Sequence, residues 1–87
     1  MEETRVAVIS MIISREESVS AINSMLHEFR DSIIGRMGIP YRQKGLNIIN
    51  VVLDAPMNIV SGLSGKLGRL EGVTVKAVYS PKKGNEE

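Results

Sequence analysis

The segment RVAVISMII, residues 5–13, decides how the rest of this chain is interpreted. Its β-branched and apolar residues predict a strand, and both alternating sets of side chains along it are apolar. The two sets are Val6, Val8 and Ile12 on one side, and Ala7, Ile9, Met11 and Ile13 on the other. A strand with two apolar faces is covered on both of them, so this strand is expected in the centre of a sheet.

A second strand of the same character is predicted at residues 46–53, LNIINVVL, and it too is expected in the centre. Asn50 is the one polar residue inside its apolar run, residues 48–53. Two further strands are predicted at residues 32–39 and 73–79. Pro40 ends the first of these or marks it as an edge strand, since proline cannot donate a ladder hydrogen bond.

An amphipathic helix is predicted over about residues 15–29, because apolar residues recur there at spacings of three and four. The preceding SREE, residues 14–17, fits a capping box. In that motif Ser14 is the N-cap, and Glu17 returns a side-chain contact to it.

A second amphipathic helix is predicted after residue 55, with Pro56 at its first position. Gly72 lies just past its expected end, where a left-handed cap is usual. Three glycines within this helix are expected to let it approach the sheet or a neighbour closely, since each costs about 1 kcal/mol relative to alanine. They are Gly62, Gly65 and Gly68.

The resulting order, βαββαβ, predicts a ferredoxin-like α+β fold: a four-stranded antiparallel sheet with two helices on one face. Residues 1–80 form one domain in this prediction, and residues 81–87 a charged flexible tail. Two helices cover only one face, whereas the central strands are apolar on both. The uncovered face would be a patch on the order of several hundred Å², which monomers rarely expose. We therefore expect a homo-oligomer whose sheets face each other or join edge to edge.

Composition argues against several classes of function. The 87 residues carry a net charge of +1 and no cysteine, so neither a concentrated basic surface nor a disulfide framework is expected. The expected central strands lack the aromatic residues on which RNA-binding sheets stack bases. No signal peptide, membrane span or direct nucleic-acid contact is expected, and we expect the protein in the cytoplasm.

Catalytic and metal-binding chemistry has little support. His27 is the single histidine, and only Glu28 and Asp31 lie near it in the sequence, so it is a weak metal candidate. Asp54, at the end of a central strand, is the one acid placed for catalysis, and its position before a helix already accounts for it. We therefore expect no enzymatic activity.

The candidate site is the cation-rich stretch GRMGIPYRQKG, residues 35–45. Two interpretations stay open: a bulged edge strand that charges and Pro40 protect from aggregation, or a surface whose cations receive an anionic ligand or a partner's carboxylates. The candidate ligand or interface residues are Gly35, Arg36, Met37, Gly38, Tyr41, Arg42 and Lys44.

Residues 35–42, GRMGIPYR, together with residues 65–70, GKLGRL, resemble the family of iron-only hydrogenase system regulators. The resemblance extends over roughly residues 4–80. It implies an ACT-like fold similar to the regulatory domain of the nickel-responsive repressor, oligomeric and with effectors at subunit interfaces. That repressor binds nickel through several histidines and a cysteine, whereas this chain has one histidine and no cysteine, so its nickel site is not expected here.

Two functions follow from the residues and the resemblance together. The first is a regulatory module that senses a small molecule or binds a protein partner, with an unidentified effector near Arg36 and Arg42. The alternative is an oligomeric scaffold or assembly protein that takes no ligand.

Overall fold

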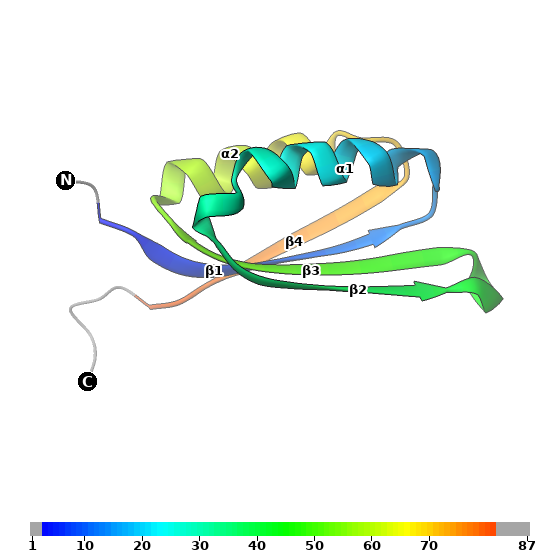
Figure 1. Ribbon diagram of the computed structural model, residues 1–87, viewed down its shortest axis with the longest axis horizontal. Coiled ribbons are helices and arrows are strands. Elements are labelled where there is room, and N and C mark those ends of the chain that lie inside the picture. Colours follow the sequence, from blue (N-terminus) through cyan, green and yellow to red (C-terminus); the bar gives the residue numbers. More distant parts are fainter. Residues whose placement is uncertain (1–2, 82–87) are drawn as a thin grey trace.

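The computed structural model describes residues 3–81, and it confirms the order of elements expected from the sequence. Figure 1 shows both helices on one side of a single sheet. The elements are β1 (Arg5–Ile13), α1 (Glu17–Glu28), β2 (Ile33–Tyr41), β3 (Leu46–Ala55), α2 (Met57–Gly68) and β4 (Val73–Tyr79). Short 3-10 turns, Arg30–Ser32 and Arg42–Lys44, lie on either side of β2.

The sheet has the strand order β2-β3-β1-β4, and every neighbouring pair is antiparallel. The predicted α+β, ferredoxin-like and ACT-like architecture is therefore confirmed. Its two central strands are β1 and β3, the strands whose two apolar faces marked them as central. Of the predicted tail, residues 82–87 lie outside the described residues.

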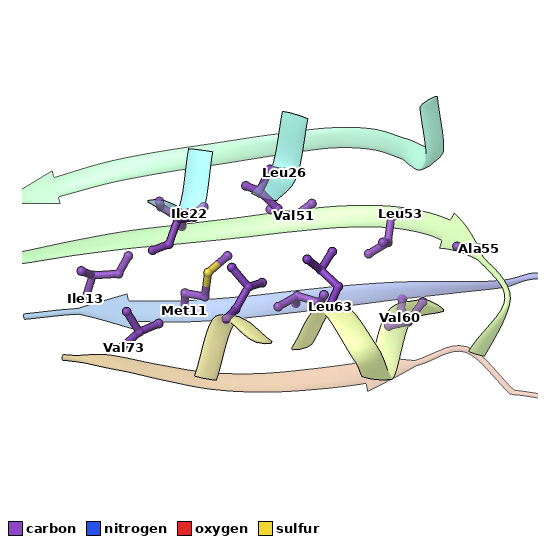
Figure 2. Packing of buried hydrophobic residues seen from close by; sticks show 14 residues of the cluster. Met11, Ile13, Ile22, Leu26, Val51, Leu53, Ala55, Val60, Leu63 and Val73 are labelled. Carbon is purple, nitrogen blue, oxygen red and sulfur yellow. The ribbon is translucent and has the colours of Figure 1, made fainter. Parts of the chain in front are cut away.

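The core lies between the sheet and the helices, as Figure 2 shows. One alternating set from each central strand enters it, including Ile9 and Met11 from β1 and Val51 and Leu53 from β3, all fully buried. The helices contribute to the core the apolar side chains that recur at spacings of three and four in the sequence. The buried helical side chains are Ile22 and Leu26 of α1 and Val60, Leu63 and Leu67 of α2. Burial of this apolar area is the main force that holds helices and sheet together.

The predicted capping box is wrong. Helix α1 begins at Glu17, and its N-cap, Glu16, makes no side-chain cap hydrogen bond. The Ser14 hydroxyl instead donates to the Gly72 carbonyl oxygen at 3.3 Å, alongside the Ser14 amide at 2.8 Å. Ser14 therefore bonds across the end of β1 to the turn before β4, and it does not cap α1 as the local sequence predicted.

The second helix also differs from its prediction at both ends. Pro56 is the N-cap rather than the first helical residue, and the helix ends at Gly68. Gly72 does adopt a left-handed conformation, with φ of +75°, but in the turn into β4. The expected close packing at Gly62 is wrong within this chain, because nothing lies within 4 Å of where its Cβ would be.

Candidate functional site

The cation-rich stretch lies along β2, which is an edge strand of the sheet. Its register against β3 shifts between Ile33 and Gly35, so β2 carries a β-bulge. A Cβ at Gly35 or Gly38 would have no neighbouring atom within 4 Å. The bulged edge strand of the first interpretation is therefore present, and the second has to be judged from where the side chains lie.

Alternation along β2 divides the candidate residues between the two faces of the sheet. Gly35, Met37 and Tyr41 pair with Val52, Asn50 and Leu46, on the face that carries no helix. Arg36 and Gly38 pair with Val51 and Ile49, whose side chains enter the core, so they lie on the helix face. Arg42 and Lys44 lie in the turn after the strand. The seven residues therefore do not form one site.

Arg36 belongs to a cavity between α1 and β2, which we call the α1–β2 cleft. Its volume is about 260 Å³, and its lining is Asn23, Leu26, His27, Arg30, Ile33 and Arg36. Arg36 Nη2 donates to Asn23 Oδ1 at 2.8 Å, and Arg30 Nη1 donates to the His27 carbonyl oxygen at 3.0 Å. Two guanidinium groups thus share a lining that includes no carboxylate, an arrangement suited to an anion.

A second cavity, of about 400 Å³, lies at the other end of β2 and includes Arg42. Its charge is mixed, because Glu16 also lines it and accepts a hydrogen bond from Asn47 Nδ2 at 3.2 Å. A larger hollow of about 730 Å³ runs along α1 from Glu16 to Glu28, but all its lining residues come from that one helix and its N-cap. The α1–β2 cleft is therefore the cavity best suited to hold an anion between two elements.

His27 lines the α1–β2 cleft and lies in the last turn of α1. Within residues 3–81, no three histidine or acidic side chains gather in a way that could hold a metal ion. None of the helices in this range is long and apolar enough to cross a membrane. Asp54 is exposed on β3, opposite Val6 of β1.

The remaining candidate surface is the sheet face that carries no helix, which we call the open sheet face. It presents the second alternating set of every strand, and it is mostly apolar. Val78 is 65% exposed there, Met37 52% and Ile12 49%. The apolar side chains of this face are Val6, Val8, Ile12, Met37, Ile39, Tyr41, Leu46, Ile48, Val52 and Val78. Exposed apolar surface of this extent is typical of an interaction site.

These features define the chain as an ACT-like, ferredoxin-like α+β domain with a cationic cleft at one edge and an apolar open face. The family model described as "TM1266-like: Iron-only hydrogenase system regulator, putative" matches residues 5–77, and the chain belongs to this family. It is similar to the solved structure of uncharacterized protein TM1266 from Thermotoga maritima, with a TM-score of 0.84 and 36% identity. That similarity covers 88% of this chain and 98% of the Thermotoga chain. No curated protein matches the chain.

Four residues of the cleft lining were not predicted from the sequence: Asn23, Leu26, Arg30 and Ile33. A signal for three of them was present. Positions 23, 26, 27 and 30 follow helical spacing, so they share one face of α1 and of the turn that follows it. Only the position of that face against β2 shows that Arg30 and Arg36 line the same cavity.

Proposed function

We propose that this chain is a regulatory module of the iron-only hydrogenase system, acts as a homo-oligomer, and binds an anionic effector in the α1–β2 cleft. The description of its family supports the regulatory role. The observation that carries the proposal is the lining of the cleft, where Arg30 and Arg36 are accompanied by no acid.

The hydrogen bonds of the cleft suit the capture of an anion. The partner of Arg36 is the neutral amide of Asn23, so an incoming carboxylate or phosphate would offer it a stronger bond between opposite charges. Leu26 and Ile33 add apolar surface to the same lining. The ligand class that fits is therefore a small carboxylate or phosphate compound with an apolar portion, or a carboxylate side chain of a protein partner.

Native mass spectrometry of protein taken from cells without dialysis tests the effector. We expect wild-type oligomers to carry a bound mass that Arg36→Ala and Arg30→Ala both lose. Arg69→Ala is the matched control, because Arg69 is exposed at the end of α2 and does not line the cleft. Retention of the bound mass by both cleft variants would place the effector elsewhere.

A second candidate function, an oligomeric scaffold that takes no ligand, is favoured by the open sheet face. An apolar face built from all four strands suits protein contact more directly than metabolite binding. Wild-type oligomers that carry no bound mass, and that show no thermal shift with any carboxylate, phosphate or metal, would select this function over the first.

A further inference from the structure

The open sheet face is built in rows that run across the strands. Cross-strand pairing places Met37, Asn50, Ser10 and Lys76 side by side on β2, β3, β1 and β4. Three of these four residues are polar, and we call Asn50, Ser10 and Lys76 the polar row. Mostly apolar rows flank it on both sides: Ile39, Ile48, Ile12 and Thr74 along one side, and Gly35, Val52, Val8 and Val78 along the other.

The centre of the polar row is held together but keeps hydrogen-bonding capacity. Ser10 Oγ donates to Asn50 Oδ1 at 2.6 Å. The Ser10 oxygen can still accept a bond, and the Asn50 amide nitrogen can still donate. Both residues are only partly buried, so this capacity lies at the surface of the single protomer.

We propose that a second copy of the chain packs face to face on the open sheet face, with its polar row over this polar row. Ser10 and Asn50 then set the register of the homodimer. This inference rests on the homo-oligomer of the proposed function, and it names both the surface and the alignment.

The size of the face is sufficient for such a dimer. Four strands spaced by about 4.8 Å and roughly eight residues long, at about 3.3 Å each, cover roughly 500 Å² per copy. Two copies together therefore bury about 1,000 Å² or more, which reaches the size expected of a biological interface. The face also suits a two-fold dimer, because a two-fold axis along the strands places each row over the same row of the second copy, polar over polar and apolar over apolar.

Charge selects between the two ways of stacking such faces. With the two-fold axis parallel to the strands, β1 of one copy lies over β3 of the other, so Ser10 meets Asn50 and Lys76 meets Met37. With the axis across the strands, Lys76 would face Lys76, and that like-charge contact is unfavourable. The first arrangement is therefore the one we assign.

The polar row also opposes a sideways shift of one sheet over the other, which is the offset that a two-fold axis along the strands leaves open. A shift by one strand, about 4.8 Å, would lose the contact between Ser10 and Asn50 and place the Asn50 amide over Lys76 or over a second Asn50. Aligned sheets cross at about 30°, so their rows stay matched best at the centre, where Ser10 and Asn50 lie. A buried polar pair that fixes register is an established use of such residues in other assemblies.

Single-cysteine variants test this arrangement directly, because the chain has no cysteine of its own. An equimolar mixture of Met37→Cys and Lys76→Cys is treated with a bismaleimide that spans the ~10 Å between packed sheets. We expect at least fivefold more cross-linked dimer in the mixture than in either variant alone. Arg69→Cys, on the helix side, is the control and should not cross-link. Cross-linking of Lys76→Cys alone would overturn the assigned axis.

The same assay in an Asn50→Leu background tests the register. Met37 and Lys76 are exposed on the surface, so their cysteine variants leave the core unchanged. We expect Asn50→Leu to remain dimeric while the Met37–Lys76 cross-link falls at least threefold, because arrangements shifted sideways by one strand become accessible. An unchanged cross-link would contradict the role of Asn50. Wild-type protein that sediments as a monomer at tens of micromolar would instead overturn the homo-oligomer itself.

Discussion

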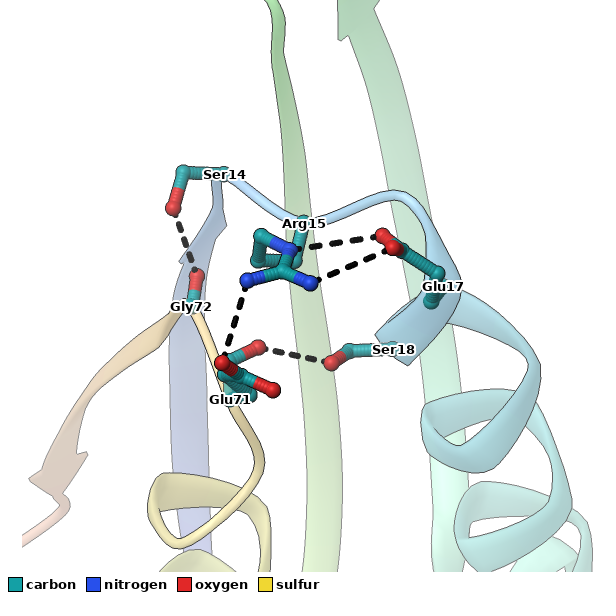
Figure 3. A network of polar contacts seen from close by, with 6 residues as sticks. All are labelled: Ser14, Arg15, Glu17, Ser18, Glu71 and Gly72. Atoms are coloured by element: carbon teal, nitrogen blue, oxygen red, sulfur yellow. Dashed lines mark hydrogen bonds and ion pairs between the residues drawn. The ribbon is translucent and has the colours of Figure 1, made fainter.

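Arg15 Nη1 lies 3.0 Å from Glu71 Oε2, which joins the segment before α1 to the segment before β4 (Figure 3). The same guanidinium reaches Glu17 in the first turn of α1, at 3.3 Å. Beside it, the Ser18 hydroxyl donates to the Glu71 carbonyl oxygen at 2.6 Å. Because the β1–α1 and α2–β4 connections both meet here, substitutions at this point test how the two halves of the fold are joined.

Gly72 is the residue of this junction that should tolerate substitution least. A Cβ there would lie 2.4 Å from Arg15 Cγ, and the backbone φ of +75° is unfavourable for any other residue. We expect Gly72→Ala to lower the free energy of unfolding by about 2 kcal/mol or more. Urea denaturation followed by circular dichroism measures this.

Gly62→Ala is the matched control for that substitution. Gly62 lies within α2, and the space around its missing Cβ is empty. We expect this variant to be more stable than wild type by up to about 1 kcal/mol, because alanine restricts the unfolded chain and favours helix. A loss of stability at Gly62 would show that α2 packs against another molecule there.

Glu17 should make folding mildly dependent on pH. The hydrogen bond from Arg15 lowers the pKa of the Glu17 carboxyl below its ordinary value. A carboxyl with a depressed pKa in the folded state stabilises the fold above its unfolded pKa, and it loses that contribution as pH falls through the folded pKa. Glu17→Gln should therefore be less stable than wild type at pH 7, with a difference that shrinks on acidification. Since both groups are exposed, 0.5 M NaCl should also diminish it.

The order and centrality of the strands could be predicted from residues 5–13 and 46–53, because an apolar strand with two apolar faces has few other places in a small domain. The ends of the helices could not be predicted as well. Ser14 has the sequence of an N-cap, but its bonds to Gly72 belong to the pairing of β1 with β4. Long-range pairing of this kind leaves no local signal.

For the candidate site, composition indicated the strand that lines the cleft, but it did not show which of its residues lie on each face of the sheet. Arg36 and Arg42 were both predicted to belong to a single cation-rich stretch. The β-bulge between Ile33 and Gly35 decides which face each β2 side chain takes, and it places Arg36 on the side of α1. A one-residue bulge reverses every later side chain of a strand, and the sequence offered only two glycines as a hint of it.

Leu67 tests how much the core between the sheet and the helices depends on one helical side chain. It is fully buried between α2 and the sheet. We expect Leu67→Ala to cost about 2–5 kcal/mol of unfolding free energy, since removing the side chain leaves a cavity. Ile34→Ala is the comparison, because Ile34 is 63% exposed at the bulge of β2 and its loss should cost less than about 0.5 kcal/mol. Equal losses in the two variants would contradict this location of the core.

Ile48 is the position from which to test the homo-oligomer itself. It lies on β3 between Ile39 and Ile12, in one of the apolar rows of the open sheet face. In Ile48→Lys the ammonium group can reach water in a single chain, whereas a face-to-face dimer would bury it without a partner. We expect the dimer dissociation constant to rise at least 100-fold, measured by sedimentation velocity over a range of concentrations, with the helical content unchanged. Ser61→Lys adds the same charge on the exposed side of α2, far from this face, and should leave association as it is in wild type. If Ile48→Lys associated as tightly as Ser61→Lys, the open sheet face would not be the surface through which copies of this chain meet.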